Sequence, residues 1–365
     1  MAVKKKRLKS PEFFPVFEIE ADSYFGLGLK LGIASREQVA ELIKRRQKWL
    51  ADLKKFALAN RSERFEPFVS GLKAHFPQYL EEMKGIAEGA EVDFESLFVL
   101  NLNPELNAMM LKAKEEDCST VAMETADRVL LAHNEDGSEQ YEGLMFLLKA
   151  KTPNGTHFFA LVYPGIIPGN GPGMNSFGVI HTCDYIGNKQ WQPGVPRYFL
   201  DRAMLEARSL NQAISLASHK ARAYSQAHNL VSLRAKKAIM IESSVAQVAV
   251  REVKGIVPRT NHYIFPEMKG EPEFVSYLKR SPRRLEALEE GLKGIRPGQI
   301  TPEKIMQALS SHVNAPLSPC RHKNKEVAGM TLGTFLFDSD SEKFRVYFGP
   351  PCRKIYKEFQ PTLAR

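Results

Sequence analysis

Cys118 stands where a charged segment of the chain meets a run of residues typical of a β-strand. Three acidic residues, 115–117, come directly before it, and the strand-like run 119–123 follows. A second run of this type, 128–133, comes after a short turn, so we expect a hairpin with Cys118 at its mouth. If the bond between Asp117 and Cys118 were cut, one residue would carry both a thiol and a free α-amine.

This arrangement would make Cys118 a nucleophile with its own base. Thiolate chemistry needs a lowered thiol pKa or an adjacent base. An α-amine, with an ordinary pKa of about 7.7 to 8.0, can be that base near neutral pH. A lone cysteine is more often a small buried hydrophobic residue. The acidic and hydroxyl-bearing neighbours of Cys118 favour the catalytic interpretation, with Asp117 and Cys118 forming the cleavage site.

The polar segment 133–137, His-Asn-Glu-Asp-Gly, ends the second run of the hairpin. Because antiparallel strands of a hairpin lie side by side, this segment folds back beside the thiol. Asp136 is the candidate for orienting the ammonium or the thiol. The alternative is that Asn134, Asp136 and Gly137 are turn formers and nothing more.

Three further polar segments are candidates for the walls of a cleft. The glycine-rich stretch 164–175 lacks the Gly-Lys-Ser/Thr ending of a phosphate-binding loop and precedes a strand, so a nucleotide site is disfavoured. Asn261-His262 and Cys320-Arg321-His322 are polar groups beside apolar strands. By residue type alone, each could equally lie on the surface.

Composition describes an ordinary globular chain of 365 residues with a net charge of +9. The basic clusters are short and scattered, so a solvated surface is favoured over a nucleic-acid partner. No apolar run approaches the roughly 20 residues of a membrane span, and a secretory signal is not evident, so we expect a cytoplasmic protein. The four cysteines include no pair at metal-site spacing, and we expect free thiols, no metal and no cofactor.

The pattern of elements predicts an α+β fold. The first third is helical in pattern, with Ser35 and Gln38 as a capping box, a break at Pro77 and a cap at Asp93. Strands grouped together, then helices, then strands again argue against a doubly wound parallel sheet. The expected strands are 119–123, 128–133, 143–150, 156–163, 176–182, 229–233, 237–243, 245–253, 331–338 and 343–348, and the expected later helices are about 196–219, 281–292 and 302–312.

The ordered set of motifs resembles the acyl-coenzyme A:isopenicillin N acyltransferase family of N-terminal nucleophile (Ntn) hydrolases. The similarity covers nearly all of the chain after the cysteine. Its pieces are Cys118 opening a hairpin, Asn134-Glu135-Asp136, Gly173-Met174-Asn175-Ser176-Phe177-Gly178, the segment 195–202, His228-Asn229-Leu230, Thr260-Asn261-His262-Tyr263, and Cys320-Arg321-His322 before Thr331-Leu332-Gly333-Thr334.

The resemblance implies a four-layer αββα sandwich made as one precursor and cut by its own cysteine. It divides the chain into a mainly helical segment, 1–117, and a core, 118–365. It implies Cys118 as nucleophile, Asp136 as the residue that positions its amine or thiol, Asn261 as oxyanion donor and Arg321 as a functional arginine. Pocket candidates are Asn134, Asn175 and His262.

Two positions depart from the family pattern. The family usually has a small residue before the nucleophile, where this chain has Asp117, and relatives often carry an asparagine near 181–184, where this chain has none. We expect a self-processing amidohydrolase that cleaves a small linear acyl amide through an acyl-thioester. The alternatives are acyl transfer from an acyl-coenzyme A or similar donor, and an unprocessed relative that only binds an acyl compound.

Overall fold

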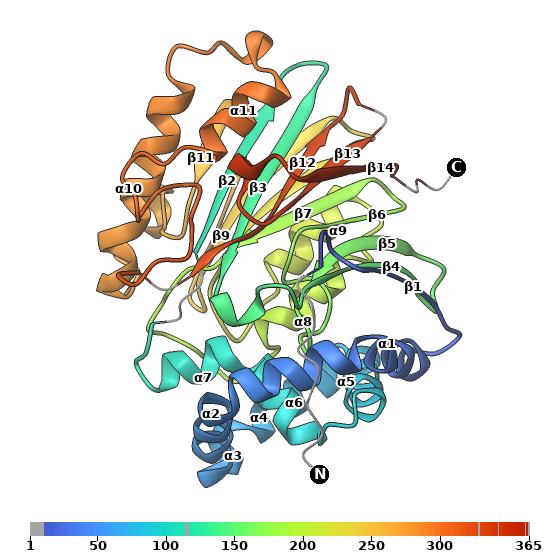
Figure 1. The fold of residues 1–365 in the computed structure, drawn as a ribbon. Coiled ribbons are helices and arrows are strands. Elements are labelled where there is room, and N and C mark those ends of the chain that lie inside the picture. The colour runs from blue at the N-terminus through green and yellow to red at the C-terminus, as the bar shows by residue number, and fades with distance from the viewer. Residues whose placement is uncertain (1–10, 114–116, 328, 342, 362, 364–365) are drawn as a thin grey trace, which may run out of the picture.

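Two β-sheets and the helices packed on them make up the computed structural model (Figure 1), which describes residues 11–361 and 363, except 114–116, 328 and 342. The helices are α1 (Tyr24–Arg45), α2 (Gln47–Ala59), α3 (Arg61–Arg64), α4 (Glu66–His75), α5 (Pro77–Gly89), α6 (Phe94–Asn101), α7 (Asn103–Met109), α8 (Arg197–Met204), α9 (Leu210–Ala217), α10 (Val275–Leu292) and α11 (Pro302–Leu309). None of these helices combines the length and apolar character that a bilayer crossing requires.

The larger sheet has the strand order β1-β4-β5-β6-β7-β8-β9-β10. Its neighbours are antiparallel except for β1, which runs parallel to β4. The strands are β1 (Val16–Glu20), β4 (Phe146–Lys151), β5 (His157–Val162), β6 (Gly173–Asn175), β7 (Val179–Asp184), β8 (Gln226–Ser232), β9 (Lys237–Ser243) and β10 (Val248–Glu252). The helical first third therefore also supplies an edge strand, which the sequence pattern did not predict.

The smaller sheet has the order β11-β2-β3-β12-β13-β14 and is antiparallel throughout. Its strands are β11 (Gly255–Arg259), β2 (Asp117–Glu124), β3 (Val129–Gly137), β12 (Met330–Asp338), β13 (Phe344–Phe348) and β14 (Tyr356–Phe359). The predicted hairpin is confirmed as β2 and β3, and Cys118 lies one residue from the start of β2. The sequence pattern did not predict β6, β11 and β14, because all three are short. β11 and β14 are also the two edge strands of the smaller sheet.

Each sheet carries helices on its outer face, which gives four layers. The side chains of α8 and α9 pack on the larger sheet in one apolar cluster with Leu230 and Ile241. Those of α10 and α11 pack on the smaller sheet in a second cluster with Val121 and Leu336. A large third cluster fills the space between the sheets and continues under the first helices. The predicted αββα sandwich is confirmed, and α1 to α7 lie together at one end of it (Figure 1).

Glycines decide how the first helices meet. On α1, Gly28 and Gly32 touch the backbone of α5 so closely that a Cβ on Gly28 would lie 1.9 Å from the carbonyl oxygen of Glu82. Gly85 and Gly89 on α5 do the same toward α1. Small residues at i and i+4 let two helix backbones approach without side chains between them. Sequence patterning undervalues such a helix because glycine weakens it in isolation.

Two predicted boundaries are corrected by this packing. Ser35 is no N-cap: it lies inside α1, where its hydroxyl donates to the carbonyl of Leu31 at 2.8 Å, and Ser23 is the residue that caps α1. The helix expected at 196–219 is two helices, α8 and α9. The break at Pro77 and the cap at Asp93, which accepts from the amide of Ser96, are confirmed.

Candidate active site

The mouth of the β2–β3 hairpin places two different sets of side chains on its two faces. In the antiparallel register, Asp117 lies opposite Asp136, Cys118 opposite Glu135, and Thr120 opposite His133. Because successive side chains of a strand point to opposite faces, Cys118 and Glu135 share the face between the sheets. Asp117 and Asp136 share the face toward α10 and α11. We call these the thiol face and the arginine face.

The thiol face joins Cys118 to two titratable neighbours. The sulfur of Cys118, a ring nitrogen of His133 and a carboxylate oxygen of Glu135 lie within 4.8 Å of one another. Nδ1 of His133 is 2.8 Å from the hydroxyl of Thr120, while Nε2 is 3.1 Å from Glu135. The hydroxyl of Tyr163 donates to Glu135 at 2.5 Å. All of these side chains are buried.

The same hydrogen-bonded chain continues into the larger sheet. Thr120 donates to the carboxylate of Asp184 at 3.0 Å, and Asn229 donates to the same carboxylate at 2.7 Å. A row of buried polar groups therefore crosses the interior from Tyr163 to Asn229. Such networks are costly to bury unless their members are hydrogen-bonded, and these members hold one another in place around the thiol.

Burial and charge set the protonation of the thiol face. Burial, with the nearby charges of Glu135 and Asp184, raises the pKa of the Cys118 thiol well above its usual value. Burial opposes a charge on His133, but its hydrogen bond and attraction to Glu135 outweigh this and raise the pKa of His133. In this uncleaved chain the thiol is therefore protonated and needs a partner that can take its proton.

The arginine face surrounds the carboxylate of Asp117 with three guanidinium groups. Arg284 lies 3.0 Å and Arg280 3.1 Å from one oxygen, and Arg321 pairs with the other. Burial alone would raise the pKa of Asp117, but these three charges outweigh it and hold that pKa below its usual value. The residue that departs from the family pattern is thus an ionised group with partners of its own.

Arg284 also reaches the backbone of the nucleophile. Its guanidinium donates to the carbonyl oxygen of Cys118 and, at 2.8 Å, to Oδ1 of Asn261. The same Oδ1 accepts from the backbone nitrogen of Cys118 at 2.6 Å, and Nδ2 of Asn261 donates to the carbonyl of Tyr185 at 2.9 Å. Asn261 is therefore beside the predicted cleavage site, and it holds the nitrogen that cleavage would free.

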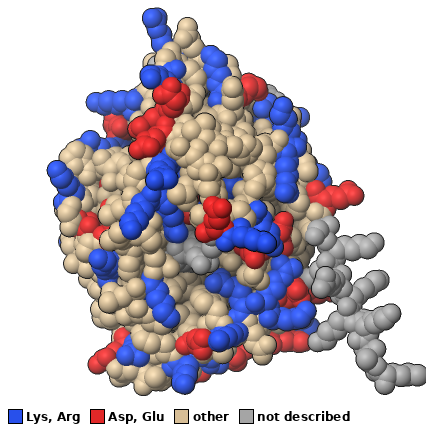
Figure 2. All heavy atoms as spheres, turned by 60° about the vertical axis from the view of Figure 1, so that its left-hand side comes forward, with Lys and Arg blue, Asp and Glu red and all other residues tan. Residues whose placement is uncertain are grey.

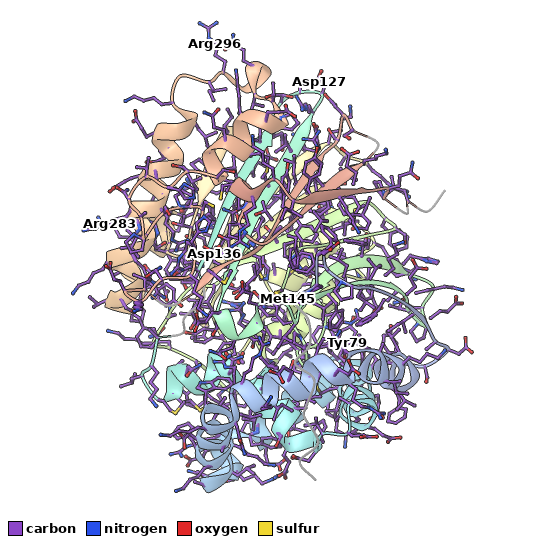
Figure 3. All side chains as sticks on the ribbon, viewed as in Figure 1. Tyr79, Asp127, Asp136, Met145, Arg283 and Arg296 are labelled. Carbon is purple, nitrogen blue, oxygen red and sulfur yellow. The ribbon has the colours of Figure 1, made fainter. Side chains whose placement is uncertain are left out.

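Asp136 lies at the end of β3 nearest the first helices (Figure 3). Neither of its carboxylate oxygens accepts a hydrogen bond of normal geometry from the described residues. Burial raises the pKa of Asp136 to about 7 against the opposing charges of Arg321 and Arg284. The side chain of Asp136 is on the arginine face, whereas the thiol of Cys118 is on the opposite face. Asp136 is therefore better directed toward the backbone nitrogen of Cys118 than toward the thiol.

The three pocket candidates have structural partners. Asn134 donates to the carbonyls of Leu309 and Pro319, each at 2.9 Å, and ties β3 to the end of α11 and to the segment after it. Asn175 bonds to the backbone around Ala207 on the larger sheet, away from the hairpin. His262 pairs with Ser281 on α10 at 2.8 Å, and burial, with nearby arginines, lowers its pKa to about 4. The fold therefore brings Asp117, Cys118, Asp136, Asn261 and Arg321 together, and it gives the other three separate contacts.

Arg280, Arg284, His133 and Glu135 are the site residues that sequence reasoning missed. Arg283-Arg284 is one of the short basic clusters for which the sequence favoured a solvated surface. In the structure Arg284 is buried, whereas Arg283 is exposed on the outside of α10 (Figure 3). A usable signal existed, because the buried positions Tyr277, Ser281, Arg284 and Leu288 follow helical spacing. His133 and Glu135 stand in the polar segment already singled out, and strand alternation together with the observed register selects them over Asp136 as neighbours of the thiol.

The candidate site is closed in the uncleaved chain. Cys118 is 3% exposed, and two surface hollows of about 460 and 610 Å³ are lined by residues other than those of the candidate site. Glu115 and Glu116, the other acids before the nucleophile, lie outside the described residues.

Lysine and arginine side chains are interspersed with acidic ones over the face seen in Figure 2.

Comparison with known proteins adds a family to this geometry. The family profile described as acyl-coenzyme A:6-aminopenicillanic acid acyl-transferase matches residues 123–353, which is more than half of the chain and begins after Cys118. An acyl-coenzyme A:6-aminopenicillanic-acid-acyltransferase (40 kDa form) of Emericella nidulans is 27% identical over 286 residues, 77% of each chain.

Two other similarities are more limited in extent. A β-alanyl-dopamine/carcinine hydrolase of Drosophila melanogaster is 30% identical over 161 residues, which make up 40% of this chain and 42% of the hydrolase, so less than half of that relative is covered. Among solved structures, a single-residue variant of a conjugated bile acid hydrolase from Clostridium perfringens matches 68% of this chain and 99% of its own, with a TM-score of 0.40 and 12% identity.

Proposed function

Because the chain belongs to the acyl-coenzyme A:6-aminopenicillanic acid acyl-transferase family, and is thus an enzyme of the hydrolase and acyltransferase classes, we propose that it is a self-processing cysteine amidohydrolase. Its substrate would be a small linear acyl amide, cleaved through a thioester on Cys118. The observation that carries this proposal is the set of contacts at one peptide bond. Asn261 holds the nitrogen of Cys118, and three arginines hold the side chain of Asp117.

Self-cleavage would begin with loss of the thiol proton toward the His133–Glu135 pair. The sulfur attacks the carbonyl carbon of Asp117, the carbon–nitrogen bond breaks, and the nitrogen takes up a proton. The result is a thioester between Asp117 and the sulfur, with a free α-amine on Cys118. Water then hydrolyses the thioester, which leaves a carboxylate on Asp117 and restores the thiol. The products are chains 1–117 and 118–365.

Turnover of an external substrate would use the freed amine. The amine accepts the thiol proton as the sulfur attacks the substrate carbonyl, and it returns a proton to the leaving amine. Asp136 and Oδ1 of Asn261 would hold the ammonium. Donation by Asn261 to the oxyanion remains a prediction, since its Nδ2 is bonded to Tyr185 in this state; one such donor is worth about 2.7 to 4 kcal/mol in acyl transfer.

The positive charge of the arginine face suggests which kind of acyl group the substrate carries. In the precursor the acyl group that moves to sulfur is that of Asp117, whose side-chain carboxylate fits among three arginines. A substrate bound in the same way would present an acyl chain ending in a carboxylate, such as succinyl. A β-alanyl chain, named for the fly relative, ends in a cationic amine that these arginines would repel.

Intact-mass measurement tests the proposal directly. Wild type should give two masses that sum to the precursor plus one water, with Cys118 at a new N-terminus, and Cys118→Ala should remain one chain of 41.2 kDa. Cys183→Ala, which removes a second buried thiol on β7, is the matched control and should still be cut. An active wild type with the Asp117–Cys118 bond intact would sink the mechanism.

Two alternatives give different results in the same samples. In acyl transfer, processed enzyme would form a new amide when a second amine is added, at the expense of free acid. In a non-catalytic relative, wild type would stay intact and Cys118 would resist alkylation. The cytoplasmic location expected from the sequence also stays a prediction, checked by fractionation of the source cells.

A further inference from the structure

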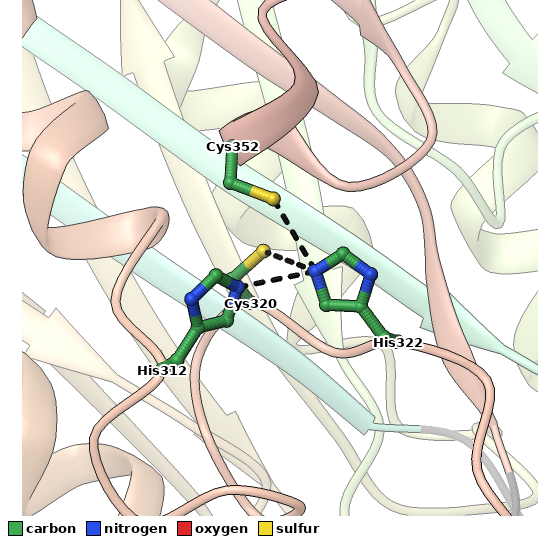
Figure 4. Close-up of side chains that lie close together, drawn as sticks. All are labelled: His312, Cys320, His322 and Cys352. Atoms are coloured by element: carbon green, nitrogen blue, oxygen red, sulfur yellow. Dashed lines mark hydrogen bonds between the residues drawn. The ribbon is translucent and has the colours of Figure 1, made fainter.

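Four side chains of types that bind transition metals converge beyond the active site. They are His312 after α11, Cys320 and His322 in the loop before β12, and Cys352 in the short helix η4 (Pro351–Arg353). One donor atom from each lies within 4.8 Å of the other three. Figure 4 shows the four side chains pointing toward one another from these three separate segments.

The spacing of the donor atoms matches a tetrahedral ion. Nε2 of His322 is 3.1 Å from Nε2 of His312, 3.8 Å from the sulfur of Cys320 and 3.3 Å from that of Cys352. Zinc bonds of about 2.3 Å to sulfur and 2.0 to 2.1 Å to nitrogen place tetrahedral ligand atoms about 3.3 to 3.8 Å apart. Two of the three measured distances therefore lie in this range, and the third is about 0.2 Å shorter than its lower limit.

Hydrogen bonding alone does not account for the cluster. Nε2 of His322 has either one proton or one lone pair, so it can satisfy one of its three close neighbours. A cation at the centre would satisfy all four donors at once. The cluster also has a route for an ion to enter, because Cys320 is buried while Cys352 is partly exposed and both histidines reach the surface.

From this geometry we propose a structural zinc site formed by His312, Cys320, His322 and Cys352. Two thiolates and two imidazoles are a common structural zinc set, and four protein ligands leave no open position for catalysis. Two thiolates also balance the charge of the ion, and binding would release the thiol protons. This inference departs from the expectation, drawn from the sequence, that the chain holds no metal.

The site would act on the candidate active site through one residue. Arg321 stands between two of the ligands, Cys320 and His322, and its guanidinium pairs with Asp117 on the arginine face. Zinc would fix the loop that presents Arg321 and would join it to η4 and to the segment after α11. Its role is thus positioning, and its existence does not depend on the proposed reaction.

Metal analysis of protein purified without a metal-affinity column tests this site. We expect about one zinc per chain in wild type and in the unprocessed Cys118→Ala variant, so the readout is independent of processing. Cys352→Ser and His312→Gln, combined, should lose the metal. His157→Gln, which changes an exposed histidine elsewhere, should keep it.

Cobalt reconstitution covers the case in which the double variant does not fold. Chelator-stripped wild type, reduced and titrated with Co²⁺, should develop the visible absorption of tetrahedral cobalt and a thiolate charge-transfer band at about one equivalent. Absence of zinc together with absence of these bands would overturn the proposal. So would a mass two hydrogens below the reduced chain that maps to a Cys320–Cys352 disulfide in freshly purified protein.

Discussion

The two faces of the β2–β3 hairpin carry opposite charge at the same point of the chain. On the thiol face, Cys118 is beside Glu135 and His133, and burial together with acidic groups raises the pKa of the thiol. On the arginine face, one residue earlier, Asp117 is surrounded by cations that lower its pKa. Strand alternation alone separates the two environments by a single residue.

This difference divides the work of the proposed reaction. The thiol face contains the sulfur and the groups that can move its proton, whereas the arginine face holds the acyl side and the nitrogen of the bond. Changes on the arginine face should therefore alter the stability of the chain, its self-cleavage and its preference for a charged substrate together. Changes on the thiol face should alter the rate and its pH dependence.

Arg284→Met should have the largest effect, because it leaves Asp117 and Asn261 without their shared buried partner. Breaking a buried ion pair from one side costs about 3 to 5 kcal/mol, and we expect self-cleavage to stop. Arg283→Met, the exposed neighbour on α10, should change stability by less than about 0.5 kcal/mol. Urea unfolding and intact mass of both variants measure this. If the two variants had equal stability and equal cleavage, Arg284 would have no role in the site.

Paired substrates measure the charge preference of the arginine face. Succinyl and butanoyl anilides are similar in length, but only the first ends in a carboxylate, and hydrogen bonds to a charged group contribute about 1.5 to 3 kcal/mol. We expect processed enzyme to favour the succinyl amide by about 10- to 100-fold in kcat/KM. Arg280→Met should reduce that ratio, whereas its butanoyl rate per processed chain should stay close to wild type. A preference for a 4-aminobutanoyl amide would contradict the assignment of this face.

His133→Gln tests the thiol face. Removing the imidazole beside the sulfur should slow self-cleavage by about 10²-fold, the lower range for a proton-transfer group, and should shift the pH at which the rate is half-maximal. The matched control is His181→Gln on β7, a histidine that is also fully buried and bonds to the carbonyl of Gly169. If both variants slow cleavage equally and without a pH shift, His133 has a packing role.

Asp136 should produce the smallest effect, visible as a dependence of stability on pH. Its folded pKa of about 7 is above its ordinary value, so the folded chain binds more protons between these values and loses stability as pH rises through this window. In the uncut Cys118→Ala background, the urea concentration at the midpoint of unfolding should decrease as the pH is raised from about 5 to 8. Adding Asp136→Asn should flatten that trend. An unchanged slope would mean that another group titrates.

The sequence predicted the part of the site that is local along the chain. The hairpin, its turn and the return of the polar segment beside Cys118 all follow from residues within one supersecondary unit. The same reasoning chose Asp136 over Glu135 as the neighbour of the thiol. The register places Glu135 opposite Cys118, and pairing register is a property of the folded sheet.

What the sequence by itself determined is the α+β class and the family, because residue types and their order carry those directly, and it singled out Cys118 as the predicted nucleophile. The tertiary structure decided which distant groups meet. Arg284 reaches Cys118 from 166 residues away, and Cys352 reaches His322 from 30. The glycines of α1 and α5 likewise acquire a role only once two helix backbones touch. Each of these depends on packing between segments whose separation along the chain leaves no local pattern.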